Sequence, residues 1–156
     1  MEIKLTEEEY KTLVEMVYLG ECMINSIRTP AHAIKKYENL EQYVYSFAKD
    51  AGLEKYIYHD AGSKMYFPSQ EMESVADKYR TEYESEVFWD ELEERLACRD
   101  MYSQYGEGAI KKMSGEEWFK KNWPFVEKYK TEFEKNVLEN LQVTNSTALL
   151  PLEEKI

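Results

Sequence analysis

One long helical stretch constrains the fold of this chain of 156 residues more than any other feature. Pro68 and Ser69 introduce the stretch, and its helical pattern continues from residue 70 to residue 104, before Gly106 ends it. The pattern fits one helix or two helices joined near Ser85. A helical segment of this length in a chain of this size predicts a mainly α-helical fold.

Two capping boxes mark the starts of two further helices. In a capping box, a Ser or Thr side chain accepts a hydrogen bond from the backbone three residues on, and a Glu at that position reaches back. Thr6 with Glu9 predicts one helix start, and Ser114 with Glu117 predicts another. The helix after Thr6 carries a broad apolar stripe, so we expect it to be the best buried helix, covered on two sides.

Two other helix boundaries follow from single residues. Asn39 can cap a helix that ends near Ala51, because Gly52 fits a Schellman ending. Pro124 disfavours helical dihedral angles in the residue before it. We therefore expect the helix after Ser114 to stop before Pro124 and a new helix to begin there.

Residues 56–67 interrupt the helical pattern. Two short runs of good strand formers flank a polar turn that contains glycine, which predicts a short β-hairpin. We find no repeat, low-complexity tract or linker, so we expect residues 1–141 to form a single helical domain, a bundle of about five to six helices with this hairpin. Residues 142–156 lack periodicity and are expected to form an extended or loosely ordered C-terminal tail.

The charge balance of the chain argues against two kinds of ligand. The formal net charge is −11, whereas nucleic-acid binding depends on cationic groups that displace counterions from phosphates. The same charge disfavours an anionic membrane surface, and no apolar run approaches the roughly 18 residues of a spanning helix. We therefore expect neither direct nucleic-acid binding nor membrane association.

The cellular compartment is inferred from the first ten residues. They lack the basic and apolar regions of a secretory signal, so we expect a cytoplasmic location. Cys22 and Cys98 are then reduced thiols. They are far apart in sequence and form no CxxC pair, so we expect both to pack as small hydrophobic side chains.

Most of the negative charge lies in the long helical stretch. Between Ser69 and Asp100, eleven acidic and four basic residues give a net charge of −7. Like-charge pairs at four-residue spacing cost only about 0.2–0.5 kcal/mol each, whereas burial of a large apolar side chain contributes about 1.5–3 kcal/mol. The helix can therefore form without a ligand. Four carboxylates recur at this spacing and are called the acidic face here: Glu82, Glu86, Asp90 and Glu94.

The acidic face has three interpretations. The first is a solvated surface without a ligand. The second is an interaction surface that either docks on a basic partner or imitates nucleic acid. The third is an all-carboxylate magnesium site. The tandem Glu-Glu-x-x-acid pattern of all-helical nucleotide pyrophosphohydrolases, which bind magnesium in this way, is absent after Glu93. A di-iron site is disfavoured because no Glu-x-x-His pair is present.

His32, His59 and Asp60 form the other candidate site. Their order resembles the H…HD…D pattern of HD-domain metal-dependent phosphohydrolases, which are also helical. The resemblance implies that these side chains bind a divalent metal, whose bound water attacks a phosphate ester. The candidates for the last aspartate of the pattern are Asp77, Asp90 and Asp100. The alternative is structural: His32 lies at a helix start and His59 in a loop, hydrogen-bonded to its surroundings.

One basic and aromatic segment offers a further surface. It contains Trp118 and Trp123 among the lysines at 111, 112, 120 and 121. Such a segment can bind an acidic peptide or a strand of nucleic acid. We instead expect both tryptophans to anchor the core and the lysines to be solvated.

The leading hypothesis from the sequence is a small non-enzymatic interaction or regulatory module. The chain has no G-x-S-x-G elbow and no glycine-rich phosphate loop. We expect the acidic face to bind an unidentified, basic protein partner without a cofactor, in a monomer or in a homodimer whose lysines meet the acidic face of the second copy. The alternative hypothesis is the HD-like phosphohydrolase that uses His32, His59 and Asp60.

Overall fold

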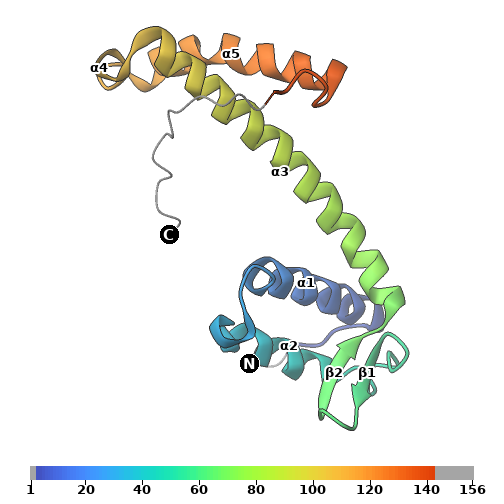
Figure 1. Cartoon of the computed structure of the whole chain (residues 1–156). Helices are drawn as coiled ribbons and strands as arrows, with labels where there is room; N and C mark the ends of the chain where they lie inside the picture. Colours follow the sequence, from blue (N-terminus) through green and yellow to red (C-terminus); the bar gives the residue numbers. More distant parts are fainter. Residues whose placement is uncertain (1–2, 143–156) are drawn as a thin grey trace. The chain divides into compact units, whose positions relative to one another are not determined.

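The computed structural model describes residues 3–142, and these residues are mainly helical with one short hairpin (Figure 1). The mainly α fold with a hairpin is therefore confirmed. All but the first residue of the expected C-terminal tail lies outside the described residues. The elements in chain order are α1 (Glu7–Asn25), the 3-10 helix η1 (Pro30–His32), α2 (Lys35–Tyr45), β1 (Ile57–Asp60), β2 (Met65–Pro68), α3 (Gln70–Tyr105), α4 (Glu107–Ile110) and α5 (Gly115–Asn136).

The chain divides into two compact units, Met1–Glu86 and Val87–Ile156. The boundary between them falls within α3, which is one helix rather than two joined near Ser85. Gly106, with a φ of 75°, ends α3 as predicted. The organisation as one domain of residues 1–141 stays a prediction. Within the described residues, every helix, α3 included, is too polar or too short to cross a membrane.

The predicted start of α1 is confirmed. The Thr6 hydroxyl accepts a hydrogen bond from the Glu9 backbone N–H at 3.2 Å, and the Glu9 carboxylate accepts one from the Thr6 N–H at 2.8 Å. The burial of α1 is less complete than expected. Met16 and Met23 are 66% and 64% exposed, because α1 packs its core face with Tyr10 and Val14 and leaves the rest of its apolar stripe open.

α2 begins before the predicted cap at Asn39. The backbone N–H of Ile34, its N-cap residue, donates to the Asn25 side chain at 2.8 Å, so a residue of α1 supports this helix start. The predicted Schellman ending is present. Gly52 has a φ of 75°, and the Leu53 N–H donates to the Ala48 carbonyl at 2.7 Å, although regular helix already stops at Tyr45 and turns follow it.

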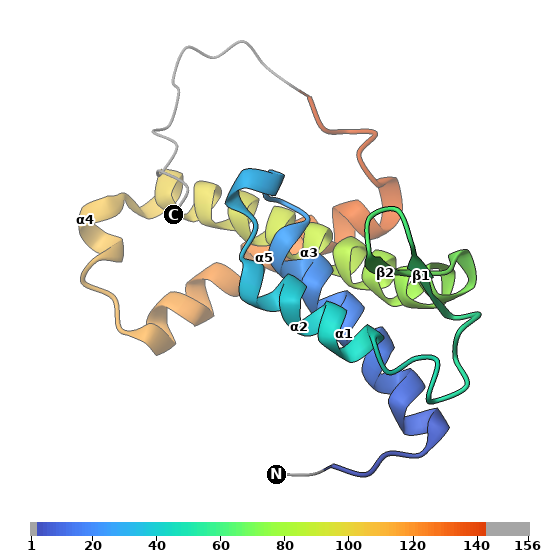
Figure 2. The same cartoon turned by 90° about the horizontal axis from the view of Figure 1, so that it is seen from below.

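The core of the first unit is built where α1, α2, the hairpin and the start of α3 meet. α1 and α2 lie side by side (Figure 2), and β2 lies next to α2 (Figure 1). The Gln42 side chain joins α2 to β2, since its amide donates to the Tyr66 carbonyl and accepts from the Tyr66 N–H. The buried side chains are Tyr10, Val14, Tyr45, Ala48, Leu53, Tyr56, Ile57 and Met72.

The second unit contains the last turns of α3 together with α4 and α5. Asp100 on α3 links to α5, and its carboxylate accepts hydrogen bonds from the side chains of Arg99, Lys128 and Tyr129. Burial alone would raise the pKa of Asp100, but these three donors outweigh it and lower the pKa to about 2. Asp100 is therefore ionised at neutral pH and fastens α3 to α5 within this unit.

The prediction of a helix break at Pro124 is wrong. α5 is continuous from Gly115 to Asn136, and its N-cap Ser114 accepts a hydrogen bond from the Glu117 N–H. Only this half of the predicted capping box forms, because the Glu117 carboxylate pairs with Lys121 at 2.8 Å. A proline inside a helix removes one backbone hydrogen bond and costs about 3 kcal/mol. Packing on the far side of the proline offsets this cost, because Phe133 is buried, stacks on Tyr129 and makes a tilted ring contact with Trp89 of α3.

Trp123 does not anchor the core as predicted. It is 46% exposed and stacks on Phe119, four residues earlier, with ring centroids 5.7 Å apart. Because α5 continues through Pro124, these two rings share one outward side of the same helix. Trp118, by contrast, is half-buried.

Candidate functional site

The acidic face lies on α3, and all four of its side chains are exposed. Glu82 and Glu86 belong to the first unit, and Asp90 and Glu94 belong to the second. Between residues 3 and 142, none of the four forms a salt bridge. The acidic face therefore presents unpaired negative charge to solvent.

The arginines of α3 are paired with other carboxylates. Arg80 lies 3.1 Å from Asp77, and Arg95 lies 2.9 Å from Glu91. Arg99 is held by Asp100, its neighbour in sequence. These pairs occupy all three arginines of α3, and Lys78, the remaining cation of this helix, forms no salt bridge with the acidic face among the described residues.

The three residues of the HD-like pattern make local interactions. His32 is exposed in η1, with its Nδ1 2.7 Å from the Thr29 hydroxyl. His59 on β1 packs against Tyr66, its partner across the hairpin. Asp60 accepts hydrogen bonds from the N–H and the hydroxyl of Ser63, which lower its pKa and close the hairpin turn. The place and contact of His32 agree with the structural alternative, whereas His59 lies in a strand rather than in a loop and contacts an aromatic ring.

Metal binding finds no support in the part of the chain that the structure describes. Between residues 3 and 142, no group of three or more His, Cys, Asp or Glu side chains is placed to hold a metal ion. The HD-like interpretation and the magnesium interpretation of the acidic face stay predictions. Cys22 and Cys98 are free and half-buried, and burial raises the pKa of both thiols, so both are poor nucleophiles at neutral pH.

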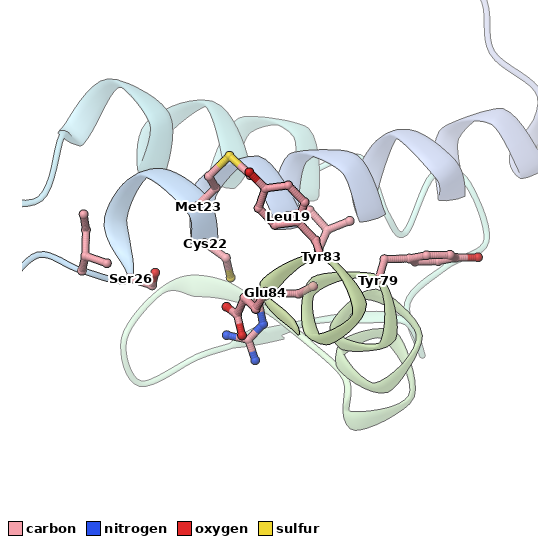
Figure 3. A pocket seen from close by; sticks show the side chains of 9 residues that line it. Leu19, Cys22, Met23, Ser26, Tyr79, Tyr83 and Glu84 are labelled. Carbon is pink, nitrogen blue, oxygen red and sulfur yellow. The ribbon is translucent and has the colours of Figure 1, made fainter. Parts of the chain in front are cut away.

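A groove of about 360 Å³ lies between α1 and α3 within the first unit, and we call it the α1–α3 groove. Its apolar walls consist of Leu19 and Met23 on α1, Ile27 just after α1, and Tyr79 and Tyr83 on α3. Figure 3 shows these two helices contributing side chains to the groove from opposite sides. The sequence did not predict this groove, although the wide apolar stripe of α1 was a signal for it.

A second hollow of about 780 Å³ lies between α1 and α2, and we call it the α1–α2 hollow. Leu5 and Leu13 contribute to one side, and Tyr43 and Phe47 contribute to the other. The two aromatic rings meet edge to face, with centroids 5.1 Å apart. The first unit thus exposes apolar surface at both ends of α1.

Glu41 on α2 has the most strongly shifted pKa among the carboxylates of residues 3–86. Burial raises this pKa to about 7, and the negative charges of Glu21 and Glu38 add to the effect. The hydroxyl of the buried Tyr45 donates a hydrogen bond to Glu41 at 3.0 Å, which lowers the pKa and offsets part of this rise. No local pattern in the sequence marks Glu41, because its burial depends on how α1 and α2 pack.

Comparison with known proteins adds no family to this description. No family model, no curated protein and no solved structure matches the chain significantly.

Proposed function

We propose that the protein is a non-enzymatic interaction module that binds a basic protein partner through the acidic face of α3. One observation supports this proposal above all: exposed, unpaired carboxylates stand directly beside an open apolar groove. Glu82 follows Tyr79 by three residues, and Glu86 follows Tyr83 by three. Residues three apart are neighbours on a helix surface, so these two of the four carboxylates border a tyrosine of the α1–α3 groove.

Charge and apolar surface contribute to binding in different ways. Complementary charge speeds the encounter and rejects wrong partners, whereas buried large side chains supply most of the affinity. The first unit, residues 1–86, has 17 acidic and 10 basic residues and a net charge of −7, so a basic partner is favoured. The cytoplasmic location and the choice between monomer and homodimer remain predictions.

Charge reversal on the acidic face tests the proposal. The variant with Glu82→Lys, Glu86→Lys and Asp90→Lys is expected to fold normally, because all three side chains are exposed and unpaired. Its yield of specifically captured protein partner from lysate is expected to fall by about tenfold or more, which corresponds to the loss of about 1.4 kcal/mol of binding free energy. The measurement is quantitative mass spectrometry of the captured proteins, with circular dichroism to check the fold.

A matched control changes the net charge by the same amount elsewhere. Glu54→Lys, Glu127→Lys and Glu139→Lys alter exposed residues outside the acidic face. This control is expected to retain capture. Equal capture by both triple variants and the wild type would contradict the proposal. A concentration-dependent doubling of molecular mass that the acidic-face variant abolishes would identify a second copy of the chain as the partner.

A further inference from the structure

The walls of the α1–α3 groove are largely uncovered. Met23 is 64% exposed, Ile27 is 83% exposed, and Tyr79 and Tyr83 are each 55% exposed. Single exposed apolar side chains are ordinary, but a contiguous set around a groove marks a binding surface. The core of the first unit already buries the other side of α1 through Tyr10 and Val14, so these side chains are not needed to complete it.

The spacing of the groove residues fits a helix as the occupant. Leu19 and Met23 are four residues apart on α1, and Tyr79 and Tyr83 are four residues apart on α3. Side chains in such rows form the ridges between which the ridge of another helix packs. A groove bounded by one row from each helix therefore accepts a row of large apolar side chains from a third helix.

The charges around the groove select a basic helix. Glu84 lines the groove, and Glu82 and Glu86 border its tyrosines. Arg80 also lines the groove, but its guanidinium is 3.1 Å from Asp77 and is partly neutralised there. A second copy of this chain is disfavoured as the occupant, because each copy carries a net charge of −11.

We infer that the α1–α3 groove is the docking site for an amphipathic helix of a partner protein, with a row of large apolar side chains flanked by lysine or arginine. This inference rests on the proposed function and specifies its partner. The apolar row enters the groove, and the basic residues meet Glu82 and Glu86. Helix-in-groove recognition of this kind uses anchors at positions i, i+3 or i+4, and i+7 of the bound helix.

Two synthetic peptides test the inference. One is a leucine–lysine peptide of about 18 residues with leucine at positions i, i+3, i+4 and i+7, which forms a helix about 27 Å long with one apolar face. The other has the same composition with leucine spread around the helix. Isothermal titration calorimetry is expected to show about tenfold tighter binding of the first peptide by the wild-type protein.

Matched variants separate the groove from the acidic face. Met23→Ala with Tyr83→Ala removes groove walls and is expected to abolish the preference for the amphipathic peptide, while Phe47→Ala in the α1–α2 hollow retains it. The double variant Glu82→Gln, Glu86→Gln is expected to weaken the binding of both peptides by the same factor. All the altered side chains are exposed, and circular dichroism verifies the fold.

The possible results distinguish a failure of the groove from a failure of the acidic face. A wild-type protein that binds both peptides equally, or a groove variant that keeps the preference, overturns the inference about the groove. If the groove variant loses the preference and the Glu82→Gln, Glu86→Gln variant binds both peptides like the wild type, the groove stands as the docking site. In that case the acidic face fails as a binding surface, so the two failures are distinguishable.

Discussion

Tyr45→Ala is expected to lower the free energy of unfolding of the first unit by about 3–5 kcal/mol, the usual cost of removing a large buried aromatic side chain. Tyr45 is 0% exposed and lies in the core cluster with Tyr10 and Val14. A domain of this size has a total stability of only about 5–15 kcal/mol. The variant is therefore expected to lose much of its folded population at moderate temperature.

Two comparison variants separate packing from other causes. Tyr45→Phe removes only the hydroxyl that donates to Glu41 and is expected to cost about 1 kcal/mol. Tyr43→Ala changes an exposed tyrosine of the same helix and is expected to cost less than about 1 kcal/mol. The measurement is denaturant unfolding followed by circular dichroism. Equal midpoints for Tyr45→Ala and Tyr43→Ala would show that the core is assigned incorrectly.

The second large effect is a dependence of stability on pH that comes from Glu41. Burial raises its folded-state pKa from 4.5 to about 7, so the folded state favours the protonated carboxyl. The contribution of Glu41 to the free energy of unfolding is complete below its unfolded-state pKa of 4.5 and is lost as the pH rises through its folded-state pKa of about 7. A rise of this size corresponds to at most about 3 kcal/mol, and solvent screening of this half-buried group reduces the effect to about 1–2 kcal/mol.

Glu41→Gln is expected to remove this dependence. The glutamine keeps an acceptor for the Tyr45 hydroxyl but cannot ionise. Unfolding free energies at pH 5 and pH 8 are therefore expected to differ less in the variant than in the wild type, and the variant is expected to be the more stable protein at pH 8. Glu54→Gln, at an exposed position, serves as the control. Parallel pH profiles for the wild type and Glu41→Gln would contradict the burial of Glu41.

The starts of α1 and α5 and the hairpin could be predicted because a few neighbouring residues determine them. The capping box of Thr6 and Glu9 needs only four residues, and the ending at Gly52 needs only one glycine in a left-handed conformation. The start of α2 could not be predicted locally, because Asn25 of α1 supports it through Ile34. At Pro124 the local rule failed, since tertiary packing around α5 outweighs the missing backbone hydrogen bond.

Of the candidate site, the acidic face could be predicted from the sequence, whereas the α1–α3 groove could not. The four-residue spacing of the acidic face fixes which carboxylates share one side of α3, and their exposure follows from the burial of other side chains. The α1–α3 groove depends on two helices with 44 residues between them in the sequence, so periodicity alone could not reveal it. The wide apolar stripe of α1 predicted cover on two sides, whereas the structure leaves Met23 open.

Three methionines allow the most direct test of docking in the α1–α3 groove. Met23 lines the groove, Met16 is exposed on α1 outside it, and Met72 is fully buried. Methionine methyl groups labelled with ¹³C, and assigned with single Met→Leu variants, can be followed by NMR during titration with the amphipathic leucine–lysine peptide. We predict that the Met23 signal shifts to saturation while the signals of Met16 and Met72 stay in place. Equal shifts for Met16 and Met23, or an unmoved Met23 signal at saturating peptide, would contradict docking in the groove.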